Sequence, residues 1–297
     1  GMKQNRIQTD DAMQELRLHG TEAFPFEYYC DVVDEYETGC IGWHWHQEVE
    51  FGYVETGTVR CLAGGQKTVI SKNEGIFINR NILHKIESGG GGVLPNFLFM
   101  PVFIAPEGSD IFRKYVVPVI ASSVSFAVIR DPGSIRLMKA LKAVCESDGP
   151  EKELEIHRLS EALWERLYRN TEKKENGNIC ISGGDLSEYR TRIMMQFIHE
   201  HYADRVRLEE IAASASISKS EALRCFHMVL GTTPVNYLIS CRLNAAADML
   251  RTKRIRVSAA AEAAGFENVS YFCRMFRKKY ALSPTEYRAA GLKPADR

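Results

Sequence analysis

The feature that most constrains this chain is a repeat inside its C-terminal third. Shifting the sequence by 49 positions aligns Ile211–Ile217 with Ala260–Phe266. After a one-residue insertion the shift becomes 50, and identical residues then align. Agreement over this many positions predicts two copies of one structural unit. The identical pairs are Arg224 with Arg274, Phe226 with Phe276, Pro234 with Pro284, and Tyr237 with Tyr287.

Each copy is predicted to be a helix, a tight turn and a second helix, because apolar or small residues recur at helical spacing around a short polar break. The capping-box pattern Ser218–Glu221 predicts that a second helix begins at about Lys219. Gly231 can end that helix in the left-handed conformation, and Thr233–Pro234 can start the next one. The second copy repeats these signals at Ser283, Pro284 and Glu286.

Two such units suit the recognition of double-stranded DNA. A helix-turn-helix places its second helix in the major groove, and two units can read successive groove segments if they are spaced near one helical turn. Between the copies, the apolar pattern from Pro234 to Thr252 predicts a single helix. At 1.5 Å rise per residue this helix is about 28 Å long. It is therefore expected to hold both reading helices on one face of the duplex.

The charge distribution agrees with a polyanionic partner. Residues 188–297 contain 18 Lys and Arg and 11 Asp and Glu, whereas residues 1–187 contain 20 and 27. The formal net charge of zero therefore conceals a basic C-terminal part and an acidic N-terminal part. Neutralisation of phosphates supplies the sequence-independent part of DNA affinity, so the basic part is the expected DNA-binding region.

With these motifs in view, the chain resembles the AraC family of bacterial transcription regulators. The resemblance rests on Leu208–Ala212, Ala264–Lys279 and Ser283–Arg288 as they stand in this sequence. It implies a regulator rather than an enzyme, with a DNA-binding domain at residues 188–291 that holds two helix-turn-helix units. The implied groove-facing residues are Ser220, Leu223, Arg224 and His227 in the first unit, and Asn268, Ser270, Cys273, Arg274 and Lys278 in the second.

The two aligned arginines leave two roles open. Each of Arg224 and Arg274 can form a bidentate pair with guanine O6 and N7, or can bind phosphate alone. One position departs from the repeat, because Ala281 stands where the first copy has Gly231. A left-handed alanine costs about 1 kcal/mol, so the second reading helix is expected to end differently.

The N-terminal part of the chain has a different residue pattern. From Phe24 to Ile129, short runs rich in Val, Ile, Phe and Tyr are broken by Gly and Asn, which is typical of antiparallel strands. We therefore predict an α+β protein whose residues 2–130 form a cupin-like antiparallel β-barrel that binds a small-molecule effector. The C-terminal domain is predicted to be all α.

A constellation of histidines lies within those strands. Gly39, His44, His46, Glu50 and Gly57 are spaced much like the first signature of the cupin barrels, and His84 lies where the second signature places its histidine. Cupins often bind a divalent transition metal with such residues, and the ligand types suit Zn, Fe, Mn or Ni. Three interpretations stay open for His44, His46, Glu50 and His84: a metal site, part of an effector pocket without metal, or polar groups of the core.

Helical spacing returns after Pro132. Residues 131–170 are predicted to form two amphipathic helices whose apolar faces cover the barrel or pair with a second subunit. In the AraC family, which this chain resembles, such a segment often mediates dimerisation, so a homodimer is expected. Residues 171–187 are polar and contain glycine, and are expected to be the interdomain linker.

Cellular context is indicated only indirectly. No signal peptide is visible, and the longest apolar runs are far shorter than the roughly 20 residues that span a bilayer. The eight cysteines contain no C-x-x-C pair, which fits reduced thiols in a cytoplasmic protein that does not use the membrane. Two competing functions remain open: a metal-dependent cupin enzyme with a DNA-binding domain, and a DNA-binding protein without an effector.

Overall fold

The computed structural model describes residues 7–17, 19–63, 66–122, 124–173, 179–183 and 186–291. The chain divides into two compact units. The N-terminal unit contains residues 1–8 and 17–185, and the C-terminal unit contains residues 186–297 together with the short segment Thr9–Leu16. Among the residues described, no helix is both long and apolar enough to cross a bilayer.

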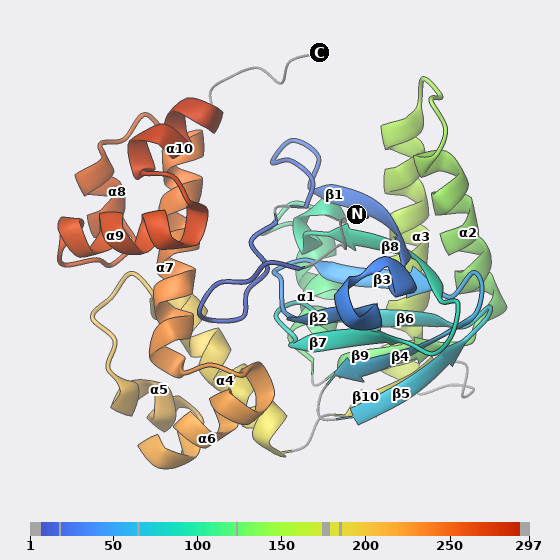
Figure 1. Cartoon of the computed structure of the whole chain (residues 1–297), viewed down its shortest axis with the longest axis horizontal. Helices are drawn as coiled ribbons and strands as arrows, with labels where there is room; N and C mark the ends of the chain where they lie inside the picture. The colour runs from blue at the N-terminus through green and yellow to red at the C-terminus, as the bar shows by residue number, and fades with distance from the viewer. Residues whose placement is uncertain are drawn as a thin grey trace. The chain divides into compact units, whose positions relative to one another are not determined.

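The N-terminal unit is built on two antiparallel sheets (Figure 1). Every neighbouring pair of strands is antiparallel, as the alternating sequence pattern predicted. The six-stranded sheet runs in the spatial order β1 (Phe26–Val32), β8 (Val93–Phe99), β3 (Val49–Tyr53), β6 (Gly75–Ile78), β9 (Val124–Ile129) and β10 (Ile179–Gly183). The four-stranded sheet runs in the order β2 (Cys40–His44), β7 (His84–Ser88), β4 (Thr58–Ala63) and β5 (Gln66–Ser71).

The predicted α+β class is confirmed, but the barrel takes the form of two sheets. Hydrogen bonds between the described strands do not join these sheets into one closed ring. The stretch 171–187, expected to be a linker, includes β10, which pairs with β9. The run Ile179–Ile181 is rich in β-branched residues and suits such an edge strand, although its surroundings are polar.

Two apolar cores lie on opposite faces of the six-stranded sheet. Alternation along β3 places Phe51 and Tyr53 in the core beneath the helices, whereas Glu50 faces the other way. The second core lies between the two sheets and includes Cys61, Ile76 and Ile86. Short helical turns complete the unit at η1 (Val33–Glu35), η2 (Glu37–Gly39), η3 (Pro101–Phe103), η4 (Phe112–Val116) and α1 (Val117–Ile120).

The predicted helical hairpin consists of α2 (Pro132–Cys145) and α3 (Lys152–Lys173), which lie side by side against the sheets (Figure 1). Asp131 caps α2 by accepting hydrogen bonds from Gly133 N and Ser134 N. Arg166 of α3 donates to both carboxylate oxygens of Asp131, at 2.6 and 2.9 Å. The apolar faces of both helices, with Leu141 and Trp164 among them, pack on the sheet, which is the first of the two roles expected for them.

The C-terminal unit is helical apart from its N-terminal segment. Its helices are α4 (Leu186–His201), α5 (Leu208–Ser214), α6 (Lys219–Leu230), α7 (Pro234–Thr252), α8 (Val257–Ala263), α9 (Val269–Tyr280) and α10 (Pro284–Gly291). Helices α5 and α6 form the first helix-turn-helix, and α8 and α9 form the second. The connecting helix α7 has the predicted bounds and packs with helices of both motifs.

The two motifs end their second helices in the same way. Gly231 ends α6 with φ 64°, and Ala281 ends α9 with φ 59°, and each donates its N–H to the carbonyl of the residue four positions earlier. The expectation of a different end in the second motif is therefore wrong. The rings of Phe276, Tyr280 and Tyr287 pack together next to this turn in the chain, and Ala281 adopts the left-handed conformation despite its steric cost.

Replacing Ala281 with glycine is expected to stabilise the C-terminal unit. Glycine removes the steric penalty of the left-handed conformation, so Ala281→Gly should raise the free energy of unfolding by about 1 kcal/mol. Urea denaturation of the full chain, followed by circular dichroism, measures the change. The reciprocal Gly231→Ala should lower the stability by a similar amount, and a loss of stability in Ala281→Gly would contradict the argument.

Candidate DNA-binding surface and histidine site

Helix α6 has one buried and one exposed face. Its buried residues Ala222, Cys225, Phe226 and Leu230 recur at helical spacing. The four residues predicted to face DNA, Ser220, Leu223, Arg224 and His227, are all exposed. Ser218 starts the helix as predicted by accepting a hydrogen bond from Glu221 N at 3.2 Å.

Arg224 is already paired within its own helix. Its Nε and Nη2 donate to the two carboxylate oxygens of Glu221 at 2.9 and 2.6 Å, and Nη2 also donates to Ser187 Oγ at 3.2 Å. The hydrogen bonds from Arg224 lower the pKa of Glu221 to about 2. An exposed ion pair of this kind contributes only about 0–1 kcal/mol. Contact with a base or a phosphate can therefore replace it.

Helix α9 presents the second predicted set in the same manner. Phe272 and Phe276 are fully buried, whereas Asn268, Ser270, Arg274 and Lys278 are exposed and Cys273 is half-buried. Asn268 also has a local role that the sequence did not reveal, because its Oδ1 accepts a hydrogen bond from Tyr271 N at 2.8 Å and caps the helix. The guanidinium of Arg274 lies 5.3 Å from the Tyr271 ring centroid.

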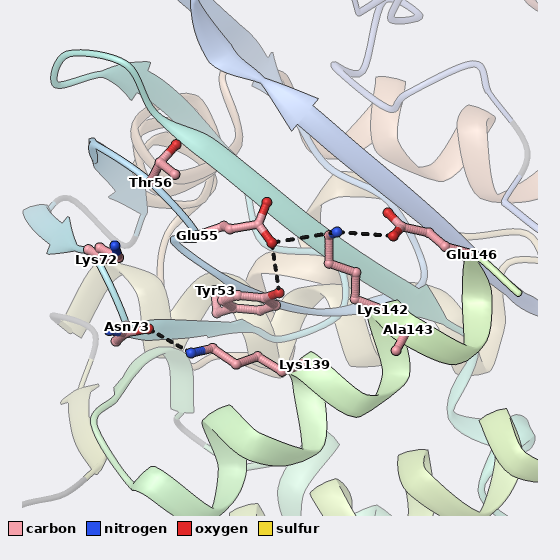
Figure 2. A pocket seen from close by; sticks show the side chains of 9 residues that line it. All are labelled: Tyr53, Glu55, Thr56, Lys72, Asn73, Lys139, Lys142, Ala143 and Glu146. Carbon is pink, nitrogen blue, oxygen red and sulfur yellow. Dashed lines mark hydrogen bonds and ion pairs between the residues drawn. The ribbon is translucent and has the colours of Figure 1, made fainter.

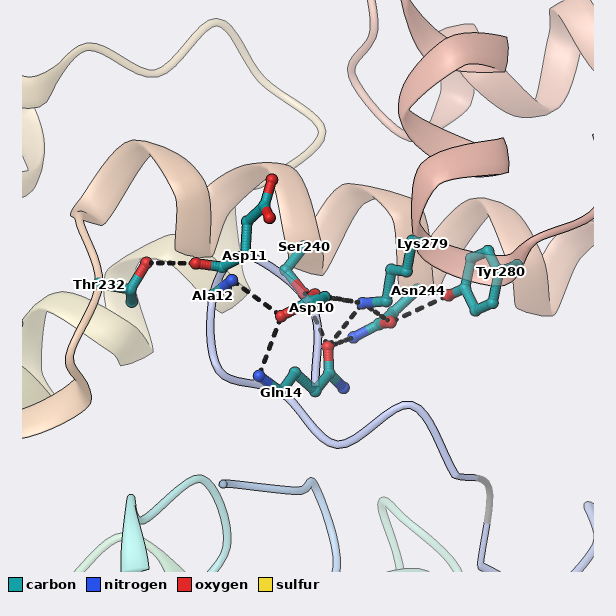
Figure 3. Close-up of polar contacts among 9 residues, drawn as sticks. All are labelled: Asp10, Asp11, Ala12, Gln14, Thr232, Ser240, Asn244, Lys279 and Tyr280. Carbon is teal, nitrogen blue, oxygen red and sulfur yellow. Dashed lines mark hydrogen bonds and ion pairs between the residues drawn. The ribbon is translucent and has the colours of Figure 1, made fainter. Parts of the chain in front are cut away.

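The segment Thr9–Leu16, here called the N-terminal turn, belongs to this unit and holds a buried lysine of α9 (Figure 3). Lys279 is only 6% exposed. Its Nζ donates to Gln14 Oε1, Ser240 Oγ and Asn244 Oδ1 at 2.6 to 2.7 Å, and lies 3.2 Å from Asp10 Oδ2. Burial lowers the pKa of Lys279, and the carboxylate of Asp10 opposes that shift.

The N-terminal turn also reaches a predicted DNA contact. Lys278 Nζ donates to the carboxylate of Asp11, and both side chains are exposed. Thr232 Oγ1 donates to the backbone carbonyl of Asp11 at 3.3 Å. The turn closes on itself because Asp10 Oδ1 accepts from the N–H groups of Ala12 and Gln14. Sequence reasoning missed the turn, since no local pattern relates residues so far apart in the chain.

In the N-terminal unit, the structure brings together the histidines and the glutamate that the sequence singled out. His44, His46, Glu50 and His84 are each at most 4% exposed. His46 Nε2 and His84 Nε2 lie 3.2 and 3.3 Å from Glu50 Oε2. One ligand atom from each of the three histidines lies within 4.8 Å of the others. We call these four residues the histidine site.

A break in strand register turns His44 inward. Ile41 faces the core between the sheets, and strict alternation would place Trp43 there too. The pairing of β2 with β7 shifts between Ile41 and His44, so that His44 pairs with His84 and Trp43 is 40% exposed. Trp45, by contrast, is completely buried.

Hydrogen bonds fix the orientation of the three rings. In each case Nδ1 contacts a nearby backbone carbonyl: His44 that of Gly42 at 2.7 Å, His46 that of Glu48 at 3.1 Å, and His84 that of Ile82 at 2.8 Å. A carbonyl accepts only from a protonated nitrogen, so Nδ1 carries the proton and Nε2 faces the site.

His19 was not predicted and lies at the edge of the histidine site. Its ring stands edge-on to that of His46, with centroids 5.5 Å apart. Its Nδ1 lies 2.8 Å from the hydroxyl oxygen of Tyr29 on β1, and the side chain is 7% exposed. His19 precedes the predicted strands and contacts them through residues distant in the sequence, so the strand pattern could not predict its place in the site.

A separate open pocket of about 560 Å³ lies beside α2 and contains none of the predicted site residues (Figure 2). Lys142 lies between two carboxylates there, 3.5 Å from Glu55 and 3.0 Å from Glu146. Lys139 donates to Asn73 Oδ1 at 2.9 Å. Burial raises the pKa of the Tyr53 hydroxyl on the pocket wall to about 12. The charge of Lys142 is thus balanced within the pocket by its two carboxylate neighbours.

Two family models match the chain in succession. The AraC-like ligand binding domain matches residues 34–172, and a helix-turn-helix domain matches residues 211–290. The chain belongs to the AraC family of transcriptional regulators. The second match begins within α5 and includes every residue predicted to face DNA, and the first includes the whole histidine site. The family inferred from the repeat is thereby confirmed.

Relatives agree over nearly the whole length. The HTH-type transcriptional regulator YdeC of Bacillus subtilis is 24% identical over 288 residues, which cover 94% of this AraC-family chain and 97% of YdeC. The HTH-type transcriptional activator RhaS of Escherichia fergusonii is 24% identical over 279 residues, which cover 92% of this chain and 96% of RhaS. Both are named as regulators of transcription.

Two solved structures align with this AraC-family chain over different lengths. An apo form of ToxT from Vibrio cholerae, carrying a lysine-to-alanine substitution, aligns over 92% of this chain and 99% of its own, with 12% identity and a TM-score of 0.45. The DNA-binding domain of AdpA, in complex with a target DNA, aligns over 33% of this chain and 87% of its own, with 30% identity and a TM-score of 0.32.

Proposed function

We propose that this regulator binds promoter DNA with α6 and α9 and changes its DNA affinity when a small molecule binds in the N-terminal unit. One observation carries the DNA half: on both helices, the predicted groove-facing residues are exposed, apart from the half-buried Cys273, while the opposite face is buried. Helix α7, with 19 residues, is a rigid spacer of about 28 Å between the motifs. This length suits two adjacent groove segments on one face of the duplex.

Selection from a random library of duplexes tests this function. The purified full chain should enrich two short conserved blocks whose centres are separated by about 10 base pairs. Binding of the enriched duplex should weaken steeply with salt, since phosphate contacts release counterions. Enrichment of no sequence, or of one block only, would contradict the use of both motifs.

The N-terminal unit is proposed to receive the effector. The histidine site is a buried cluster of polar groups of the sort that orient a small ligand. An enzyme that uses the same four residues is the competing function, and the regulatory names of relatives matched over nearly their full length favour regulation. We further propose a cytoplasmic homodimer, in keeping with the described cysteines, which form no disulfide, and with the hairpin of α2 and α3. Sedimentation of the full chain tests the dimer.

Lys278 is proposed to contact a DNA phosphate, so Lys278→Ala should weaken binding about equally for all sequences and reduce the salt slope by about one. Asp11 competes for the same ammonium, and an exposed pair of this kind is worth about 0–1 kcal/mol. Asp11→Asn should therefore strengthen binding by up to about 5-fold. Fluorescence anisotropy across a salt series measures both variants. A change in sequence preference in Lys278→Ala would instead indicate base contact.

A further inference from the structure

The histidine site places four polar side chains in the protein interior, where apolar side chains would be enough for packing. Glu50 comes from β3 of the six-stranded sheet and His84 from β7 of the four-stranded sheet, so the cluster joins the two sheets across the core. The three imidazole rings are close together, with centroid distances of 4.2, 5.1 and 5.6 Å. Such a group is stable only if its charges and hydrogens are mutually compatible.

The hydrogen positions imposed by the backbone create a conflict at the centre of the site. With the proton on Nδ1, the neutral ring presents a lone pair at Nε2. His46 and His84 both direct Nε2 at the same carboxylate oxygen of Glu50. Lone pairs facing a carboxylate repel it, and a cation bound between them removes that repulsion. Two added protons would place two cationic rings about 5.1 Å apart in a buried space, beside the third ring.

A single divalent cation resolves this conflict. We propose that His44, His46, His84 and Glu50 bind one first-row transition metal ion, and that its occupancy sets the DNA affinity of the regulator. The metal would accept the Nε2 lone pairs and the carboxylate together. The bonds from Nδ1 to backbone carbonyls are the outer contacts that orient metal-binding histidines. The regulatory half of this proposal rests on the proposed function, whereas the binding half does not.

The donor set indicates the class of metal. Three imidazole nitrogens and one carboxylate oxygen suit Zn²⁺, Fe²⁺, Co²⁺ or Ni²⁺, whereas Mg²⁺ and Ca²⁺ prefer sites made of oxygen ligands alone. No cysteine thiolate competes among the four residues. Burial of all four side chains also distinguishes the cluster from exposed acidic patches that attract cations weakly. The site is thus predicted to select transition metals over the abundant alkaline-earth ions.

Metal titration of the full chain tests the binding half. Protein stripped with a chelator and then dialysed should bind one Zn²⁺, Ni²⁺ or Co²⁺ per chain, as measured by native mass spectrometry. It should not bind Mg²⁺ or Ca²⁺ under the same conditions. At a hundred-fold excess over Kd, the metal should raise the Tm of the N-terminal unit by about 5–10 °C. Bound Co²⁺ should show the visible absorption expected of nitrogen coordination. Stoichiometric binding with this spectrum supports the site, and no binding overturns it.

Paired variants exclude binding elsewhere. His44→Gln with His84→Gln should lower metal affinity by more than about 100-fold. The matched control is His157→Gln with His201→Gln, which changes two half-buried histidines outside the site and should leave affinity unchanged. Since the site variant can fail to fold, Glu50→Gln is the second test: it preserves shape and should still reduce affinity about 10-fold or more. Equal affinities in site and control variants overturn the proposal.

The regulatory half is measured on the selected duplex. DNA affinity should differ by at least about 5-fold between metal-free and metal-loaded chain, and this difference should vanish in the double site variant. Metal binding without any change in DNA affinity would overturn the regulatory half alone. Failure of the metal-free and metal-loaded chain to select any DNA sequence would instead contradict the proposed function, so the two failures are distinguishable.

Discussion

Replacing Arg224 and Arg274 together by alanine is expected to abolish sequence-specific DNA binding while leaving the fold intact. Both side chains are exposed on the second helix of their motif, and each can bind guanine O6 and N7 through two hydrogen bonds. Each such pair is worth about 1–3 kcal/mol of discrimination against the wrong base. The two sites are on separate motifs, so their effects should be close to additive.

The side-chain contact that DNA must replace differs between Arg224 and Arg274. Arg224 has to exchange its bidentate contact with Glu221, whereas Arg274 lies over the Tyr271 ring. The measurements are affinities for the selected duplex and for a scrambled duplex, with Arg158→Ala on the exposed face of α3 as the control. If both duplexes lose affinity equally, the arginines bind phosphate, and their assignment to bases is wrong.

Replacing Asp10 by alanine is expected to destabilise the C-terminal unit strongly. The carboxylate of Asp10 is the anionic partner of Lys279, and both side chains are less than 10% exposed. Removing one member of a buried ion pair leaves the other charge uncompensated, which costs about 3–5 kcal/mol. Movement of the N-terminal turn can expose Lys279 to water and reduce this loss. The lower end of that range is therefore the expected value.

The neighbouring residue provides a matched control. Asp11 has the same chemistry and lies in the same turn, but its partner Lys278 is exposed and the pair is 56–61% accessible. Asp11→Ala should therefore change the free energy of unfolding by no more than about 1 kcal/mol. Chemical denaturation of the full chain measures both variants. Similar effects from Asp10→Ala and Asp11→Ala would show that Lys279 does not depend on Asp10 in solution.

The C-terminal motifs could be predicted closely because their signals are local. Ser218 and Thr233 cap the helices that follow them, and Gly231 ends α6 in the left-handed conformation, as expected. Helical spacing also separates the buried face from the exposed face within a few residues of chain. Because the motif is duplicated, the same local signals also predicted the second copy. Ala281 is the exception, since it takes the left-handed conformation although alanine disfavours it.

The histidine site could be predicted only in part. The spacing of His44, His46 and Glu50 gave the residues, but it did not reveal the register break between Ile41 and His44 that accompanies the exposure of Trp43. His19 joins the edge of the site from a stretch without strand pattern. The strand β10 was likewise not predicted. It lies in a polar stretch of the sequence, and it forms by pairing with the edge of β9.

By itself the sequence determined the duplicated helical motifs, the exposed reading faces and the antiparallel character of the N-terminal unit. Periodicity and caps act over a few residues, so they can be read from the chain directly. Only the tertiary structure decided that Asp10 and Gln14 surround Lys279, and that His46 and His84 both approach one oxygen of Glu50 in the core. These contacts join residues distant in sequence, and their energies depend on burial that no local pattern records.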